Sequence, residues 1–333
     1  MQRELAIEFV RVTESAALAS APWMGKGQKK SADGAAVDAM RTMFETVKIN
    51  GVVVIGEGEK DEAPRLYIGE KIGDQKDGPE LDIAVDPVEG TTLVARGLPN
   101  ALSVVAVADR GSLLQAPDIY MDKIMVGPKV KGVINIDASV EDNLRATAEA
   151  LNKSVKDLTV IVLDRDRHKD LISEIRSVGS RIKLLADGDV AGGIASALDD
   201  NGIDMAIGIG GATEGVLTAA ALRCLGGEIQ ARLVYRDETD KQKARDLGIT
   251  NLDKIYKTED LAAGDDVMFA VTGITDGDLL KGVRYHGNKA TTYSLIMRSK
   301  TGTVRYISAD HKITQKPDYF PKDIFNIKAS KDH

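Results

Sequence analysis

An apolar run that ends in carboxylates lies in the segment Leu81-Asp-Ile-Ala-Val-Asp-Pro-Val-Glu-Gly-Thr91. The apolar and β-branched residues at its start predict a β-strand. Pro87 is expected to stop this strand, and Gly90 allows the tight turn that follows. Asp86 and Glu89 then flank backbone N–H groups that could face an anion. The pattern predicts hard oxygen ligands beside a phosphate-binding turn.

Outward from this stretch, short apolar segments predict further strands. They lie at residues 52–55, 102–108, 158–163, 181–186, 203–209 and 228–235. Helical spacing predicts helices at residues 3–20, 34–47 (with Ser31 and Asp33 as N-caps), 141–151, 168–178, 190–198 and 215–225. From about residue 132 the two element types alternate, which is the pattern of a parallel sheet with crossover helices.

The chain is expected to form two domains of an α/β protein. We place the boundary near residue 130, with an N-terminal α+β domain at 1–130 that carries the metal site and a C-terminal α/β domain at 131–333 that carries the sugar-phosphate loops. Two more apolar stretches follow at 267–272 and 291–307. The second is expected to be a hairpin that turns at Thr301-Gly302, because glycine favours tight turns.

Composition narrows the function. The chain has 333 residues, 43% of them hydrophobic, and a net charge of −7, which excludes a disordered protein and argues against a general nucleic-acid binder. Its one cysteine, Cys224, excludes an intramolecular disulfide and a cysteine-based zinc site. Any metal would therefore be held mainly by carboxylates, which favours Mg²⁺ or Mn²⁺. No apolar run is long enough to span a membrane and the N-terminus is charged, so we expect a cytoplasmic protein.

A second acidic segment, Gly56-Glu57-Gly58-Glu59, also follows a predicted strand. It resembles a dinucleotide-binding glycine fingerprint, but Asp61 stands where the third glycine belongs. Its carboxylates would also repel a pyrophosphate. Acids that follow a strand can be no more than helix caps or solvated turns, yet the whole set is better explained by phosphoryl chemistry beside a metal.

Three predicted strands of the second half end in polar loops, which a parallel sheet would place at one edge. The loops are Asp164–His168, Asp187-Gly188-Asp189 and Gly210–Glu214. Arg165 and Arg167 can hold a phosphate, and aspartates of the second loop can accept hydrogen bonds from sugar hydroxyls. The alternative is that these arginines form a solvated, salt-bridged turn.

Two other phosphatase chemistries fit less well. A cysteine phosphatase needs an arginine six residues after its nucleophile, and Gln230 stands there after Cys224. The loop at Asp187 resembles the nucleophile loop of haloacid-dehalogenase phosphatases, but Ala191 stands where that motif carries threonine or valine. This alternative leaves the acidic set of the first half unexplained.

The residues at 86–91 are similar to the Asp-Pro-x-Asp/Glu-Gly-Thr signature of the metal-dependent, lithium-sensitive type of sugar and inositol phosphatases. Further co-linear segments resemble class II fructose-1,6-bisphosphatases: Ala32-Asp33-Gly34, Val54–Glu59, Asp61–Pro64, Ala116–Met121 and Gly208–Gly215. The resemblance implies a two-domain layered α-β-α-β-α sugar-phosphatase fold, a Mn²⁺ or Mg²⁺ requirement and a homo-oligomer, a dimer or tetramer. It also implies hydrolysis of the 1-phosphate of fructose 1,6-bisphosphate by metal-activated water, in gluconeogenesis. Sedoheptulose 1,7-bisphosphate as substrate and a non-catalytic sugar-phosphate-binding module stay open.

The resemblance also assigns roles to individual residues. As metal ligands it implies Asp33, Glu57, Asp86, Glu89 and Glu214. As substrate contacts it implies Glu89, Gly90, Thr91, Tyr120, Arg165, Asp166, Arg167, Asp187, Gly188, Asp189 and Gly211. Lys29, Asp61 and Thr91 are expected at the reacting phosphate, where Thr91 orients the attacking water and Asp61 or Glu57 accepts its proton. Asp166 departs from the family pattern, in which proline is common, and adds negative charge beside the expected phosphate clamp.

Overall fold

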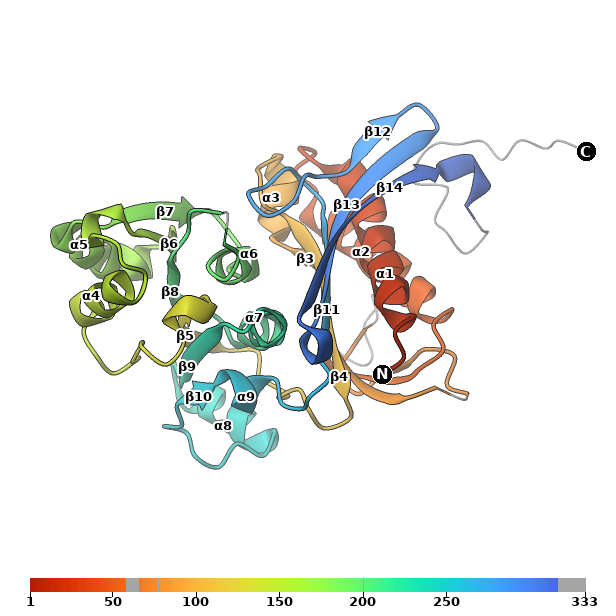
Figure 1. Cartoon of the computed structure of the whole chain (residues 1–333). Helices are drawn as coiled ribbons and strands as arrows, with labels where there is room; N and C mark the ends of the chain where they lie inside the picture. The colour runs from red at the N-terminus through yellow and green to blue at the C-terminus, as the bar shows by residue number, and fades with distance from the viewer. Residues whose placement is uncertain (58–65, 77, 200, 317–333) are drawn as a thin grey trace, which may run out of the picture.

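The computed structural model describes residues 1–57, 66–76, 78–199 and 201–316. Across these ranges, two β-sheets alternate with three layers of helices (Figure 1). The helical layers are α1 (Leu5–Ser20) with α2 (Lys29–Phe44), then α6 (Val190–Ala195) with α7 (Ala212–Leu225), then α4 (Val140–Ala150) with α5 (Lys169–Val178). This layered arrangement confirms the expected α-β-α-β-α fold class.

The first sheet has the strand order β12-β13-β11-β4-β3-β1-β2, and β14 pairs with β13. Its strands are β1 (Asn50–Ile55), β2 (Lys71–Ile72), β3 (Glu80–Glu89), β4 (Leu102–Asp109), β11 (Met268–Gly273), β12 (Arg284–His286), β13 (Lys289–Arg298) and β14 (Thr303–Lys312). The hairpin predicted near the C-terminus is confirmed, because β13 and β14 pair in antiparallel register and Gly302 takes a φ of +56° between them.

The second sheet has the order β10-β9-β5-β8-β6-β7. Its strands are β5 (Tyr120–Val126), β6 (Thr159–Leu163), β7 (Arg181–Leu185), β8 (Met205–Gly211), β9 (Glu228–Val234) and β10 (Tyr256–Lys257). Strands β6 to β9 run in one direction, as the alternation predicted. The sheet is nevertheless mixed, because β5 lies antiparallel between β8 and β9. The sequence did not reveal β5, since Asp122 and Lys123 interrupt its apolar pattern.

The division into two domains at residue 130 stays a prediction. Strand β5 precedes that residue and pairs in the second sheet, whereas β11 to β14 follow it and pair in the first. The chain therefore crosses between the sheets twice.

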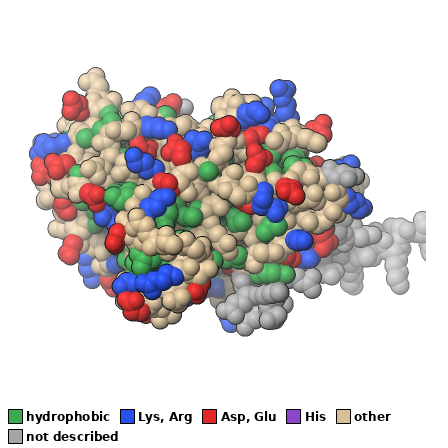
Figure 2. Space-filling model, turned by 90° about the horizontal axis from the view of Figure 1, so that it is seen from below, with side chains coloured by type: hydrophobic (Ala, Val, Ile, Leu, Met, Phe, Trp, Pro, Cys, Tyr) green, Lys and Arg blue, Asp and Glu red, His purple; other side chains and the backbone are tan. Residues whose placement is uncertain are grey.

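Among the helices in the described ranges, none combines the length and apolar character needed to cross a bilayer. Basic and acidic side chains are interspersed over the face in Figure 2, in keeping with the small net charge.

Two expected element boundaries are wrong. Helix α2 begins at Lys29 rather than at residue 34, so Asp33 lies inside the helix and does not cap it. Strand β3 passes through Pro87 and ends at Glu89. Proline is tolerated there because the register against β4 shifts between Asp86 and Glu89, which is the signature of a β-bulge.

Apolar clusters fill the spaces between the layers. The predicted apolar face of α1, with Leu5, Phe9, Val12 and Ala16, is buried against the first sheet. Helix α7 lies between the two sheets and buries ten of its 14 residues, four of them alanines. A helix that is apolar nearly all round belongs in a core, and its small side chains let both sheets approach it.

A buried polar group ties α1 to the C-terminal hairpin. Thr292 of β13 donates a hydrogen bond to Glu14 Oε1 at 3.0 Å and lies 2.8 Å from His311 Nε2. Burial, together with the positive charge of Lys316, lowers the pKa of His311 to about 4. Imidazole is thus kept neutral in the folded protein over a range where it is charged in the unfolded chain.

This group predicts an acid-sensitive contribution to stability. A depressed histidine pKa stabilises the fold above the unfolded value of about 6.5, and the contribution is lost as the pH falls from there towards 4. We expect the difference in unfolding free energy between wild type and His311→Gln to shrink by on the order of 2–3 kcal/mol between pH 7 and pH 4. Chemical denaturation of both proteins at several pH values measures this difference in unfolding free energy.

His286 provides the matched control, because it is exposed on β12. The substitution His286→Gln should leave the pH dependence of unfolding as in wild type. A His311→Gln profile parallel to that of wild type would show that His311 titrates normally.

Candidate functional site

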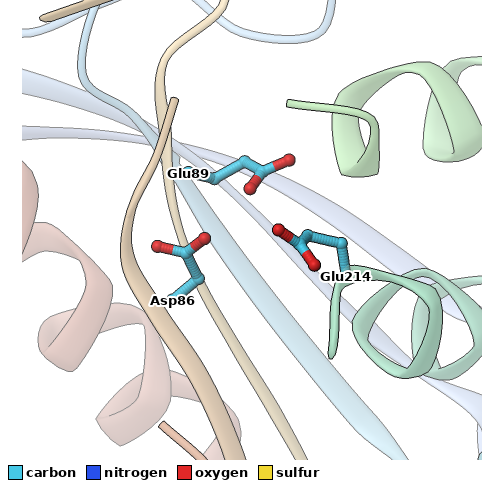
Figure 3. Close-up of side chains that lie close together, drawn as sticks. All are labelled: Asp86, Glu89 and Glu214. Atoms are coloured by element: carbon cyan, nitrogen blue, oxygen red, sulfur yellow. The ribbon is translucent and has the colours of Figure 1, made fainter. Parts of the chain in front are cut away.

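Three carboxylates from both halves of the chain converge between the sheets (Figure 3). Asp86 and Glu89 lie on β3, and Glu214 lies in the first turn of α7. One oxygen of each lies within 4.8 Å of the others. Oxygen donors at this spacing are the set that a hard divalent cation prefers, so the cluster could hold a metal ion.

The bulge in β3 explains how two residues three apart reach the same spot. In a regular strand, residues i and i+3 point to opposite faces. Asp86 pairs with Val104 and Glu89 with Leu102, so β3 has one extra residue at this point. The backbone N–H of Val88 donates to Asp86 Oδ1 at 2.9 Å and fixes that carboxylate in the bulge.

Burial and the repulsion between like charges make the ionised forms of these carboxylates unfavourable. Burial and the charge of Glu214 raise the pKa of Glu89 to about 8. Burial and the charges of Glu89 and Glu57 raise the pKa of Asp86 well above its ordinary value. The carboxylates thus retain protons near neutrality in the absence of a cation, and a bound cation would displace them.

The other two predicted ligands border the cluster. Burial and the charges of Asp33 and Glu214 raise the pKa of Glu57 to about 7, so these carboxylates share one electrostatic environment. Burial also raises the pKa of Asp33, which projects from α2. Neither belongs to the group within 4.8 Å, so a five-ligand site stays a prediction. A cavity of about 610 Å³ adjoins Glu57, Asp86 and Glu214.

The residues predicted at the reacting phosphate lie at the start of two helices. Gly90 has a φ of +87°, and this left-handed residue turns the chain into helix α3 (Thr91–Arg96). Thr91 is therefore the first residue of α3, immediately after the turn that separates it from Glu89. Lys29 begins α2 and donates to Thr92 Oγ1 at 2.7 Å, which places its ammonium beside the same turn. Asp61 lies outside the described residues.

The predicted sugar loop touches the carboxylate cluster directly. The backbone N–H of Val190 donates to Glu89 Oε1 at 3.1 Å. Gly188 has a φ of +69°, and a Cβ there would come within 2.7 Å of the same oxygen. Only a glycine permits this approach, so the loop after β7 and the end of β3 form one continuous surface.

The loops after β6, β7 and β8 meet at one edge of the second sheet, as predicted. Arg165 lies 2.5 Å from Asp187 Oδ1, across two loops. Arg167 donates through Nε and Nη2 to the carbonyl of Ile209, at 3.0 and 2.7 Å. Its guanidinium also lies 4.8 Å from the centre of the Tyr120 ring. Each arginine has five N–H donors, so both keep donors for a ligand.

His168 explains why the arginine loop holds its position. Its Nδ1 lies 2.8 Å from the Leu163 carbonyl, and its Nε2 accepts from the Ile209 N–H at 2.8 Å. The side chain of Asp166 is 93% exposed and pairs with Lys169 at 2.8 Å. Its contact with the substrate stays a prediction.

Gly211 lies between the second sheet and Glu214. A Cβ at this position would overlap Glu214 Oε2, so the glycine leaves room for the carboxylate to fold back over its own helix start. Thr213 donates to that oxygen at 2.7 Å. The local sequence therefore orients Glu214 toward β3.

Two residues of the site were missed by sequence reasoning. Lys123 lies fully buried on β5, 2.5 Å from Asp189 Oδ2, and Arg236 lies 5.7 Å from the centre of the Tyr120 ring. A lysine next to Asp122, inside a mostly apolar stretch, was the available signal for the first. Arg236 gave no signal, since it pairs locally with Asp240 and reaches Tyr120 only through the fold.

The cysteine alternative is excluded by the environment of Cys224. Its side chain is buried in α7, and burial raises the pKa of the thiol to about 12. Such a thiol is not ionised near neutrality and is no nucleophile. Asp187, the nucleophile of the haloacid-dehalogenase alternative, is paired with Arg165.

Comparison with known proteins gives consistent similarities. The family described as "Bacterial fructose-1,6-bisphosphatase, glpX-encoded" matches residues 3–311. The chain is 48% identical over 328 residues to "Fructose-1,6-bisphosphatase 1 class 2" of Escherichia coli (strain K12), with 95% of this chain and 97% of the relative covered. The same values hold for "Fructose-1,6-bisphosphatase class 2" of Shigella flexneri.

The raised carboxyl pKa values predict that a cation stabilises the protein more as the pH rises. Stability that is present below the unfolded pKa of 4.5 is lost as the pH rises through about 7 for Glu57 and about 8 for Glu89. The melting temperature in EDTA should therefore fall between about pH 5 and pH 8, and Mn²⁺ should restore it. The difference in melting temperature between Mn²⁺ and EDTA should become smaller in Glu89→Gln. A difference that does not change with pH in wild type would contradict the link between cation binding and carboxylate ionisation.

Proposed function

The chain belongs to the bacterial fructose-1,6-bisphosphatase family, and we propose that it hydrolyses fructose 1,6-bisphosphate at the site around Asp86, Glu89 and Glu214. The products are fructose 6-phosphate and phosphate, a reaction of gluconeogenesis. One observation carries the assignment: Glu89 of the acidic cluster accepts a hydrogen bond from Val190, next to the predicted sugar loop. A substrate with a phosphate at each end could thus contact both sets of residues.

The donor set fits a divalent cation. Three carboxylates with oxygens within 4.8 Å of one another are suited to hold one through Asp86, Glu89 and Glu214. The raised pKa values of Asp86 and Glu89 fit a site that a cation would stabilise, and Glu57 and Asp33 lie beside it. When bound, a divalent cation supplies positive charge that offsets the phosphate and favours ionisation of water.

The chain's own residues supply the positioning and the proton transfer. We assign Thr91 to orient the attacking water through its hydroxyl, next to the turn at Gly90. Lys29, beside the same turn, contributes positive charge toward the reacting phosphate. Glu57 or Asp61 accepts the proton that the water loses.

The other end of the substrate is assigned to the loops of the second sheet. Arg165 and Arg167 bind the distal 6-phosphate, and Tyr120 packs against Arg167. The loop Asp187–Asp189 and Gly211 contact the sugar. Binding energy from this end aligns the 1-phosphate for attack, which raises the rate of the chemical step.

We also propose the finer properties that the family resemblance implies. Hard oxygen donors favour Mg²⁺ or Mn²⁺ as the ion. A homo-oligomer, a dimer or tetramer, is a further property that the resemblance implies. A cytoplasmic location accords with a buried, unpaired Cys224.

Removing one carboxylate should nearly abolish phosphate release from fructose 1,6-bisphosphate. Asp86→Asn and Glu214→Gln keep size but lose a charged ligand, and we expect turnover to fall by at least ~100-fold, a loss of about 2.7 kcal/mol in transition-state stabilisation. EDTA should have the same effect on wild type, reversed by Mn²⁺. Glu80→Gln changes an exposed carboxylate on the same strand and should retain activity; undiminished turnover in EDTA would overturn the metal assignment.

Removing the distal clamp should discriminate between substrates. Arg167→Ala should weaken use of fructose 1,6-bisphosphate by roughly 10- to 150-fold, since a charge-assisted phosphate contact contributes about 1.5–3 kcal/mol. Fructose 1-phosphate lacks the distal phosphate and should lose much less. Steady-state kinetics on both substrates measure the difference, with the exposed Arg145→Ala as control. Equal losses on both would mean that Arg167 is structural.

A further inference from the structure

A lysine is buried at the junction of the three loops. Lys123 of β5 is 0% exposed, and its Nζ lies 2.5 Å from Asp189 Oδ2 and 2.9 Å from the carbonyl oxygen of Gly211. An unpaired buried ammonium is highly unfavourable, so both contacts are needed to keep this charge in the core. They are made to two different segments, the loop after β7 and the last residue of β8.

The glycines of β8 and α7 provide the space for this contact. A Cβ at Gly210 would overlap Asp189 Oδ2 and lie 3.0 Å from Lys123 Nζ. A Cβ at Gly215 would lie 3.4 Å from Lys123 Cδ. The glycine-rich segment at 208–215 thus has a local role beyond the turn: it leaves a channel that the lysine side chain fills.

The ion pair leaves one acceptor of Asp189 unused. Its Oδ1 is buried and has no hydrogen-bond partner among the described residues. A buried carboxylate oxygen without a partner is unfavourable, which favours a ligand that donates to it. Lys123 holds Oδ2, so the direction in which Oδ1 points is fixed before a sugar arrives.

We propose that Lys123 is a positioning residue for the sugar end of the substrate, an inference that rests on the proposed function. It acts through Asp189, whose free oxygen it aims at a sugar hydroxyl, and through Gly211, whose peptide it holds at the start of α7. The residue touches no substrate itself. Because Gly211 is three residues before Glu214, the same ammonium links the sugar loop to the acidic cluster.

Charge-balanced variants distinguish a positioning role of Lys123 from a merely structural one. Lys123→Met leaves Asp189 as a buried charge without a partner, and Asp189→Asn does the same to Lys123, so both should lower the melting temperature. The double variant Lys123→Met/Asp189→Asn contains neither charge and should recover much of that loss. Its KM should nevertheless stay high, because the oriented carboxylate is absent.

KM and kcat for fructose 1,6-bisphosphate and the melting temperature are measured on wild type, both single variants and the double variant. We expect KM to rise roughly 10- to 100-fold in Lys123→Met, more than kcat falls, and to rise no further in the double variant, since both substitutions remove the same contact. The surface pair Lys129→Met/Asp199→Asn is the matched control and should keep the wild-type KM.

A KM within two-fold of wild type in the double variant would overturn the positioning role, even if Lys123→Met alone fails to fold. A double variant with additive losses in KM would also contradict it. Turnover of fructose 1,6-bisphosphate by wild type tests the proposed function separately. Failure of the proposed function can therefore be told apart from failure of the positioning role.

Discussion

Repulsion between closely spaced carboxylates is the constraint on which this structure depends. Asp86, Glu89 and Glu214 place oxygens within 4.8 Å of one another, although each would be more stable in water. Two of them come from a bulged strand of the first sheet and the third from a helix that lies between the sheets. The packing of α7 therefore determines whether the cluster exists, because a shift of that helix would separate Glu214 from β3. Burial, together with this proximity of like charges, raises the pKa values of Asp86 and Glu89.

Glu89 joins the two functions of the site. Its carboxylate belongs to the acidic cluster and also accepts from the backbone at Val190, where the loop after β7 turns into α6. Behind that loop, Lys123 holds Asp189 and Gly211 from the second sheet. A continuous series of contacts thus runs from β3 through the loop after β7 to Arg165, which pairs with Asp187. Pre-organisation of this kind is what converts binding of a remote phosphate into alignment of the reacting one.

Much of this arrangement could be predicted from sequence because its signals are local. Strands that end in acids, and three polar loops after strands of one direction, follow from apolar periodicity and turn residues. What escaped prediction depends on partners distant in the chain. The bulge at Pro87 needs β4 opposite it, and β5 is recognisable as a strand only when Lys123 is seen to be neutralised by Asp189, 66 residues later. The helix start at Lys29 was missed because Asp33 faces the acidic site instead of capping the helix. Asp61, assigned by resemblance, lies outside the described residues, and the metal, substrate and catalytic roles of all the other site residues stay predictions.

We have proposed that a divalent cation is held where the two halves of the chain meet. Anomalous diffraction from crystals of the protein soaked in Mn²⁺ tests it most directly, since manganese scatters anomalously and the chain's own atoms do so only weakly. The claim predicts a strong peak between Asp86, Glu89 and Glu214, with carboxylate oxygens at about 2.0–2.3 Å, as is usual for ions of this class. A peak confined to other acidic residues, with these three carboxylates left as they are without the ion, would contradict it.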